Sequence, residues 1–225
     1  FSLKDTMDYY KTEFDNRCIP TRVIYHGTDK LYDPAKNPGF KLPFDNYFVV
    51  FGNFYKHKFV PQLLEALKSS KHRIIVIGST SEGAIGNSMY GYKSGNLSDE
   101  FIDYVLGNSL GIIFPSIYEG FGLPFLDGMS YSKKIIVNNT ELNRELRNYF
   151  DAFSENVYIF DSLDEVDGIL DKVEADPVIH YKNNDSHIRS WEDSAKELED
   201  CLAGVLAAPV NVELLYERWH FYQYL

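Results

Sequence analysis

The chain has 225 residues, and the 44% that are apolar can build the core of one large domain or two small ones. Acidic residues outnumber basic residues by 33 to 22, and the net charge of −11 argues against a broad surface for nucleic acid or anionic lipid. Any phosphate group must therefore be held by a local site. Cys18 and Cys201 stand far apart without a CxxC pattern, which predicts reduced thiols and neither a disulfide framework nor a zinc site.

Two elements are expected before the middle of the chain. Residues 3–15 have the pattern of a helix, and residues 21–27, TRVIYHG, have that of a strand. Three prolines between residues 29 and 45 then indicate an irregular connection.

From Tyr47 onward, short apolar runs alternate with amphipathic segments. The continuously apolar runs VVFG, IIVIG, GIIF and IIVN are typical of strands buried on both faces, joined by right-handed helical crossovers. The sequence therefore predicts an α/β fold with a doubly wound, Rossmann-like parallel sheet. The expected strands are 47–52, 73–79, 110–116, 134–139 and 157–160, and the expected helices are 59–70, 98–108, 123–132, 140–150 and 162–173. A glycine-rich loop and the short segment GYKSG follow the second strand.

Two more helices are expected at the end of the chain, from about Ser190 to near Pro209 and over 210–225. No apolar run reaches the roughly 18 to 20 residues that span a bilayer, and the first ten residues lack the basic-then-apolar order of a signal peptide. We therefore expect a cytoplasmic protein.

Ligands of doubly wound sheets lie beyond the carboxyl ends of the strands. Four such ends are FGN at 51–53, IGS at 77–79, FPS at 114–116 and VNN at 137–139. The third leads into PSIYEGFGLP, residues 115–124, which reads as a strand-to-helix turn. Pro124 suits the first turn of a helix, and glycines at positions 120 and 122 allow close approach, so the backbone amides and the helix dipole favour a diphosphate there. The alternative is that the glycines only permit a tight turn.

Two carboxylates near this turn suggest a sugar beside the diphosphate. Glu119 stands at the end of a buried strand, where it would repel phosphate but accept hydrogen bonds from hydroxyl groups. Asp127 lies about one turn into the next helix, within reach of a ribose. Either acid could instead simply favour the positive end of the helix, an effect worth roughly 0.3 to 1 kcal/mol.

The stretch PSIYEGFGLPFLDGMSYSKKIIVNN, residues 115–139, resembles a known motif. It is similar to the region around the Glu, seven residues, Glu motif in the C-terminal domain of retaining GT-B glycosyltransferases, in particular glycosyltransferase family 4. The resemblance continues in order from about residue 20 to 205, through VIYHGTD, YFVVFGNFYKHKFVPQLLEALK, RIIVIGS, GNLSDEFIDYVLGNSLGIIFPS and SWEDSAKELEDCL. It implies a hexosyltransferase that moves a sugar with retention from a nucleotide diphosphate sugar, a UDP- or GDP-sugar, to an acceptor hydroxyl, without a metal or other cofactor.

The resemblance also implies a role for each matching residue. Glu119 would contact hydroxyls of the donor sugar, and Lys58 would neutralise the departing diphosphate, although a plain solvated lysine is the alternative for the latter. Asp127 takes the position of the second Glu, which grips the ribose. The remaining donor-binding positions are Gly52 and Asn53 in the first loop, Tyr92, Lys93 and Ser94 around the base, and the backbone of Gly120, Phe121, Gly122 and Leu123 at the diphosphate.

Two residues depart from the family pattern. Asn53 stands where the family has an arginine, which removes one of the two cations expected at the phosphates and could shift that load to Lys56 or His57. Asp127 is one methylene shorter than the glutamate it replaces.

One Rossmann-like domain fits the chain, whereas a GT-B enzyme has two. We therefore expect residues 1–20 to be a helix or linker from a preceding domain, residues 21–209 to be the nucleotide-sugar-binding domain, and residues 210–225 to be a C-terminal helix. The expected partners are the nucleotide sugar, a glycan or lipid-linked acceptor and the missing N-terminal domain, with no nucleic acid. The full enzyme is expected to serve glycan or polysaccharide biosynthesis, with peripheral attachment to the inner face of a membrane as a further expectation.

Two other functions stay open at this point. The domain could be non-catalytic and act in protein interaction, because Asn53 removes a cation and a partner domain is missing. It could also belong to another GT-B enzyme, such as a nucleotide sugar epimerase or a phosphorylase.

Overall fold

The computed structural model describes residues 22–29, 39–93, 95, 97–182, 188–209 and 212–223. The chain divides into two compact units, one from Thr28 to Ile188 and one formed by the residues on either side of it. The predicted domain boundaries at residues 20 and 209 stay predictions.

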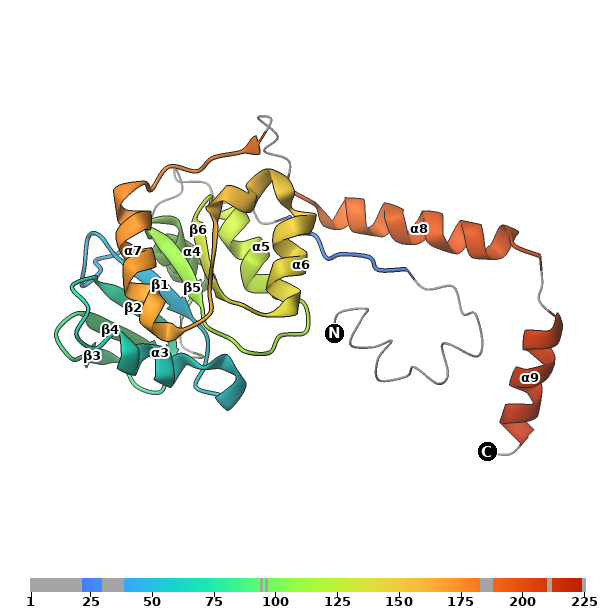
Figure 1. The fold of residues 1–225 in the computed structure, drawn as a ribbon, viewed down its shortest axis with the longest axis horizontal. Coiled ribbons are helices and arrows are strands. Elements are labelled where there is room, and N and C mark those ends of the chain that lie inside the picture. The colour runs from blue at the N-terminus through green and yellow to red at the C-terminus, as the bar shows by residue number, and fades with distance from the viewer. Residues whose placement is uncertain are drawn as a thin grey trace. The chain divides into compact units, whose positions relative to one another are not determined.

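The larger unit is built on a sheet of seven strands in the order β3-β4-β2-β1-β5-β6-β7 (Figure 1). All neighbours pair in parallel except β3 and β4, which are antiparallel. The strands are β1 Phe48–Phe51, β2 Ile74–Ser79, β3 Gly83–Ile85, β4 Met89–Lys93, β5 Gly111–Phe114, β6 Lys134–Asn138 and β7 Val157–Phe160. The predicted α/β class and doubly wound parallel sheet are therefore confirmed.

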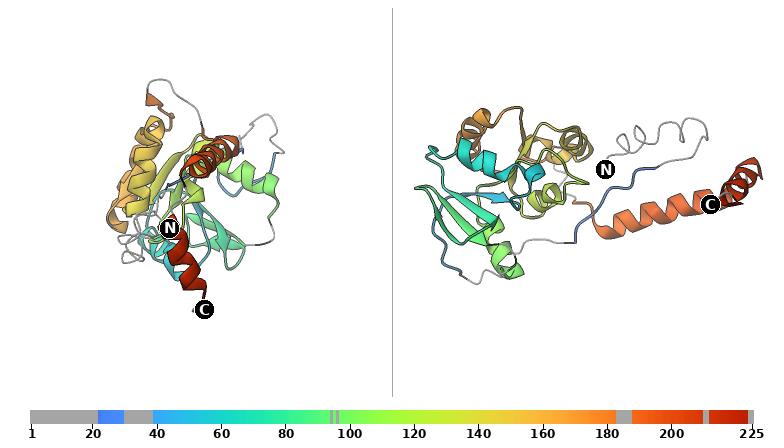
Figure 2. Two further views of the ribbon diagram at one scale, coloured as in Figure 1. Left: turned by 90° about the vertical axis from the view of Figure 1, so that its right-hand side faces the viewer. Right: turned by 90° about the horizontal axis from the view of Figure 1, so that it is seen from below.

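The helices of this unit follow the strands as the sequence predicts. They are α3 Val60–Ala66, α4 Asp99–Gly107, α5 Leu123–Ser130, α6 Glu141–Tyr149 and α7 Val166–Ala175, with short 3₁₀ helices η2 Lys56–Lys58, η3 Asp151–Asn156 and η4 Leu163–Glu165. Helices α3 and α7 share one apolar core with one face of the sheet, and α4 lies on the opposite face (Figure 2). Both faces of the central strands are buried, which explains why their sequences are apolar at every position rather than at alternate ones.

Polar side chains define where two of these helices begin. Ser98 precedes α4 and accepts a hydrogen bond from the Phe101 amide, and Thr140 precedes α6 and accepts one from the Asn143 amide. Each side chain satisfies an amide that the first helical turn leaves without a partner, an effect worth about 1 kcal/mol. These caps fix where the chain leaves the carboxyl edge of the sheet.

The smaller unit contains α8 Trp191–Ala207 and α9 Val212–Gln223, in agreement with the two predicted C-terminal helices. Ser190 and Asp193 form a capping box at the start of α8. Large apolar side chains are exposed on both helices, among them Leu202 on α8 and Trp219 on α9. Of the helices that the structure describes, none combines the length and the apolar character needed to cross a bilayer.

One expectation for the flanking elements is wrong, one lies outside the described residues, and one hairpin within the sheet was missed. Residues 22–29 form no strand, because the Tyr25 carbonyl accepts hydrogen bonds from the side chains of Arg189 and Ser194 instead of a neighbouring strand. The glycine-rich loop after β2 contains the β3–β4 hairpin, which was not predicted. The helix expected over 3–15 falls outside the described residues.

Candidate functional site

A cavity of about 400 Å³ opens at the carboxyl ends of β1 and β2. Its lining combines two strand ends with the approach to α4 and consists of Phe51, Gly52, Asn53, Lys58, Ile77, Gly78, Gly95, Leu97 and Ile102. Lys58 is the basic side chain in this lining. The walls are mostly apolar, which suits a planar ring, while the lysine suits an anion.

The first loop of the site leaves β1 at Gly52 and returns as α3. Gly78 makes room for it, because a Cβ atom at that position would stand 2.5 Å from the Gly52 carbonyl oxygen. Asn53 accepts a hydrogen bond from the Tyr55 amide at 3.2 Å, so its side chain closes a local turn. The carbonyl of His57 then accepts a hydrogen bond from the Ile117 amide at 2.9 Å, which ties this loop to the one after β5.

The hydrogen bond between the two loops places Lys58 next to Glu119. The Lys58 Nζ lies 2.6 Å from the Glu119 Oε1, and the two side chains are 22% and 20% exposed. A pair this close and this sheltered from water is held more firmly than a surface ion pair. The structure therefore joins the two residues that the sequence singled out as catalytic candidates.

The loop after β5 leads into α5 through Gly122. Gly122 has φ +82°, in the left-handed region that favours glycine, and it is the residue before the first turn of α5. Glycine has no side chain with which to cap the helix, and Pro124 is in the first turn, as predicted. Leu123, the first residue of α5, is 55% exposed. The amino end of α5 thus faces the surface beside Glu119, with the partial positive charge that suits an anion.

Asp127 lies in the middle of α5 and is partly exposed. Its carboxylate lies near the hydroxyl of Tyr131 and helps to raise the pKa of that group, although burial and a hydrogen bond to Asp103 contribute more. The structure places Asp127 on the same helix as the proposed diphosphate site but does not include it in the cavity lining.

The expected base-binding residues lie at the end of β4. Tyr92 is buried, and its ring packs against Phe101 of α4 with centroids 4.8 Å apart. Burial is also the main reason that the pKa of Tyr92 is raised. Lys93 is exposed at the end of the strand, and Ser94 lies outside the described residues. Tyr92 therefore supports the wall that α4 forms, while Gly95, three residues further on, lines the cavity itself.

A family model described as Glycosyl transferases group 1 matches residues 36–191, more than half of the chain. The chain belongs to this family. Every site residue named above lies inside the matched range. The comparison with curated proteins found no match.

Three solved glycosyltransferase structures of similar fold are longer than this chain. Sucrose-phosphate synthase from Thermosynechococcus elongatus matches with a TM-score of 0.67 and 16% identity over 91% of this chain and 57% of that one. WaaG, a glycosyltransferase involved in lipopolysaccharide biosynthesis, matches with 0.55 and 12% over 77% of this chain and 52% of that one. The pneumococcal O-GlcNAc transferase GtfA, in complex with UDP and GlcNAc, matches with 0.54 and 14% over 92% and 45%. These identities establish the fold alone, which is that of GT-B C-terminal domains, and the chain spans about half the length of the structures it matches.

Three residues at the site of this group 1 glycosyltransferase were not assigned to it from the sequence. Leu97 and Ile102 line the cavity from the approach to α4, and Gly78 lets the first loop pass β2. The amphipathic helix at 98–108 was predicted, but its side chains were not assigned to the site. Their position at the carboxyl end of β4 was the available signal, because parallel strands end at one edge of the sheet.

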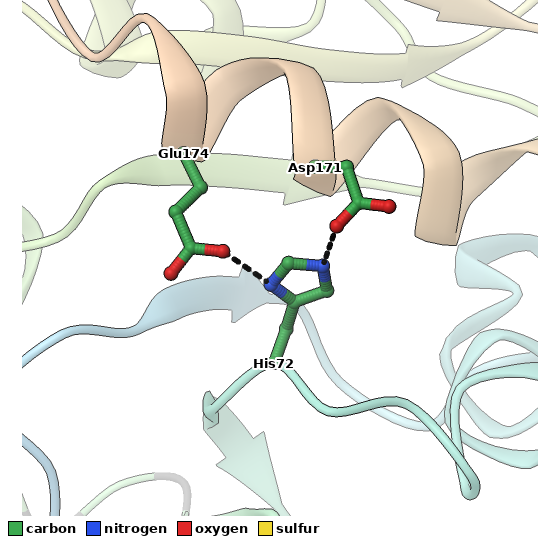
Figure 3. Close-up of side chains that lie close together, drawn as sticks. All are labelled: His72, Asp171 and Glu174. Atoms are coloured by element: carbon green, nitrogen blue, oxygen red, sulfur yellow. Dashed lines mark hydrogen bonds and ion pairs between the residues drawn. The ribbon is translucent and has the colours of Figure 1, made fainter.

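A second polar cluster lies at the opposite, amino-terminal edge of the sheet. The two ring nitrogens of His72, just before β2, lie 3.1 Å from an Asp171 oxygen and 3.2 Å from a Glu174 oxygen of α7 (Figure 3). Lys71 also contacts Asp171, at 2.7 Å. Among the described residues these ligand atoms are close enough to hold a metal ion, but each ring nitrogen already has its own carboxylate. The cluster fastens α7 to the start of β2 and is no part of the cavity site.

Proposed function

We propose that the chain is the donor-binding half of a retaining GT-B glycosyltransferase of the family 4 type. It binds a UDP- or GDP-sugar, and the complete enzyme transfers the hexose to an acceptor hydroxyl without a metal. The single observation that carries the proposal is the Lys58–Glu119 pair, which joins a residue of the cavity lining to the loop that leads into α5. Family membership supports a glycosyl transfer, and one structural neighbour holds UDP and GlcNAc.

Each part of the donor has a counterpart in this arrangement. The base would occupy the cavity, and the ribose would lie outside its lining, where Asp127 would accept hydrogen bonds from the ribose hydroxyls. The diphosphate would lie at the amides of residues 120–123, where the α5 dipole and Lys58 offset its charge. Glu119, at the end of β5, would then accept hydrogen bonds from the sugar hydroxyls.

The chemistry depends on the charge of the leaving group. When the bond between the anomeric carbon and the β-phosphate oxygen breaks, both bonding electrons go to the diphosphate. A lysine held at that oxygen stabilises the new charge, and this electrostatic contribution is often the largest in such reactions. The acceptor oxygen forms its bond on the face that the diphosphate leaves, and its proton goes to the departing phosphate oxygen.

A thermal-shift screen tests the donor site. The chain is heated with UDP, GDP, ADP or TDP at millimolar concentration, and a ligand at about 100 times its Kd adds about 2.7 kcal/mol to the free energy of unfolding. We expect one of these nucleotides to raise the melting temperature, and Lys58→Ala to abolish the shift. Lys68→Ala is the matched control, because Lys68 also pairs with a glutamate, Glu65, but away from the cavity. The absence of any shift in the wild-type chain contradicts the proposal.

One observation favours a second candidate, a domain without catalytic function. The Asn53 side chain accepts the hydrogen bond from the Tyr55 amide, and Glu119 neutralises Lys58. The cavity therefore has little net positive charge. Such a domain would bind a protein partner rather than a nucleotide. The same screen separates the two candidates, because only a donor site gives saturable nucleotide binding.

A further inference from the structure

Helix α4 forms one wall of the cavity, and its position depends on a few polar and aromatic contacts. Ile102 of α4 and Leu97 just before it line the cavity. The C-terminal half of the helix is fixed by a hydrogen bond from the hydroxyl of Tyr47, the residue before β1, to the Val105 carbonyl at 2.9 Å. The half that carries Ile102 packs through Phe101 on the ring of Tyr92, and it has a second, polar attachment.

Tyr131 supplies that second attachment. It directly follows α5, and its hydroxyl donates a hydrogen bond to the Asp103 carboxylate of α4. Only 2% of Tyr131 is exposed, and its amide donates to the Asp127 carbonyl at 3.0 Å. One buried side chain therefore connects the residue next to Ile102 with the helical turn that begins at Asp127.

The charges around the Tyr131 hydroxyl keep it a donor. Burial raises its pKa most, the Asp103 hydrogen bond raises it further, and the charges of Asp127 and Asp99 add to the effect. The hydroxyl therefore stays protonated at neutral pH. The hydroxyl has one proton to donate and several carboxylates nearby, and in this structure it donates that hydrogen bond to Asp103.

We propose that Tyr131 and Asp103 are positioning residues for the nucleoside half of the donor. Their hydrogen bond sets the distance between the α4 wall of the cavity and Asp127 on α5, so that base and ribose are gripped together. The inference rests on the proposed donor-binding function. The diphosphate half of the site, at Lys58 and the start of α5, lies outside this connection.

The division between the two halves of the ligand supplies the test. UDP, GDP and inorganic pyrophosphate are titrated by calorimetry into the wild-type chain and into Tyr131→Phe. We expect Tyr131→Phe to raise the Kd of the nucleoside diphosphate that binds to the wild type by about tenfold. The Kd of pyrophosphate should stay within about twofold of its wild-type value. A purely structural role would weaken both ligands together or neither, and either result overturns the inference.

Two further variants make the test specific. Asp103→Asn keeps an oxygen that can accept the hydrogen bond from the Tyr131 hydroxyl, so this variant should lose less nucleotide affinity than Tyr131→Phe. If Tyr131→Phe fails to fold, Asp103→Asn takes its place in the test. Tyr47→Phe is the control, because it removes a different hydrogen bond to α4 and should leave the Kd of both ligands within about twofold; a selective loss in this variant overturns the inference. If the wild type binds pyrophosphate but neither nucleotide, the proposed donor function fails first, and the inference fails with it.

Discussion

The Lys58 Nζ lies 2.6 Å from the Glu119 Oε1, although the two residues leave the sheet from different strands. Lys58 stands at the end of η2, after β1, and Glu119 follows β5, the strand that pairs with β1. The two proposed contacts of the donor therefore neutralise each other when no ligand is present. Binding must replace this ion pair with contacts to phosphate and to sugar hydroxyls.

The first prediction concerns this competition. Glu119→Gln removes the charge that competes with phosphate for Lys58, so we expect the mutant to bind UDP or GDP about threefold to tenfold more tightly than the wild type. The same change removes the stronger acceptor for sugar hydroxyls, so the preference for the nucleotide sugar over the free nucleotide should fall. Calorimetric titration of both ligands measures the two effects.

Lys58→Met is the companion variant for this experiment. It keeps most of the side-chain volume but has no charge, so nucleotide binding should weaken instead of strengthen. Weaker nucleotide binding in Glu119→Gln as well as in Lys58→Met would mean that Glu119 contacts the phosphates or supports the fold, contrary to the competition described here.

The second prediction concerns the turn into α5. Gly122 has φ +82°, and an added Cβ atom would lie 3.2 Å from the Leu146 Cδ1. Gly122→Ala should therefore lower the free energy of unfolding by about 1 to 2 kcal/mol, measured by urea denaturation. Gly168→Ala is the control: Gly168 lies inside α7 with nothing within 4 Å of the new Cβ, so the substitution should raise stability by roughly 0.5 to 1 kcal/mol.

The third prediction concerns Lys134, which is only 1% exposed at the start of β6. Within the described residues its Nζ has no hydrogen-bond partner, and the Asp176 carboxylate is 3.7 Å away. Lys134→Met keeps the volume without the buried charge, so we expect a gain of about 1 to 2 kcal/mol in the free energy of unfolding. Lys134→Ala, which leaves a cavity, should not show this gain.

The pH dependence of the Lys134 variants provides an independent check. Burial lowers the pKa of Lys134 from 10.5, so the unfolded chain binds its proton more tightly than the folded protein does. Wild-type stability should therefore rise relative to Lys134→Met as the pH increases toward 10.5. A constant difference between pH 7 and pH 10 would contradict this, because it would mean that the pKa of Lys134 is the same in the folded and unfolded chain.

The fourth prediction concerns the cluster at the amino-terminal edge. The hydrogen bond from Lys71 lowers the pKa of Asp171 below 3.8, and His72 adds to the effect. A lowered pKa contributes stability above the ordinary value that is lost as the pH falls through the folded value. Asp171→Asn should therefore be less stable than the wild type at pH 7, and the gap should begin to narrow below about pH 4. Urea midpoints between pH 3 and pH 7 measure it, and a gap as wide at pH 3 as at pH 7 is the contrary result.

Much of the fold could be predicted from the sequence because its signals are local. Runs such as RIIVIGS are apolar at every position, and β2 occupies nearly the same residues, Ile74–Ser79. The β3–β4 hairpin was missed because its residues, with Gly83 and Gly86, have neither strand alternation nor an apolar run. The strand at 21–27 was wrong because the Tyr25 carbonyl accepts hydrogen bonds from the side chains of Arg189 and Ser194 instead of pairing with a strand.

The candidate site could be predicted in part. The positions of Glu119, Gly122 and Lys58 follow from strand ends and from one resemblance, and the structure joins the first and last of them. The Tyr131–Asp103 hydrogen bond and the closure of the Asn53 turn depend on distances between elements, which sequence patterns do not contain.

The most direct test of the central claim is a crystal structure of the chain with the nucleoside diphosphate that gives the largest thermal shift. We predict the β-phosphate within hydrogen-bond distance of the Lys58 Nζ and of the amides between Gly120 and Leu123, with the Lys58–Glu119 pair opened. A nucleotide bound elsewhere, or one that leaves the 2.6 Å contact of Lys58 with Glu119 intact, would contradict the account.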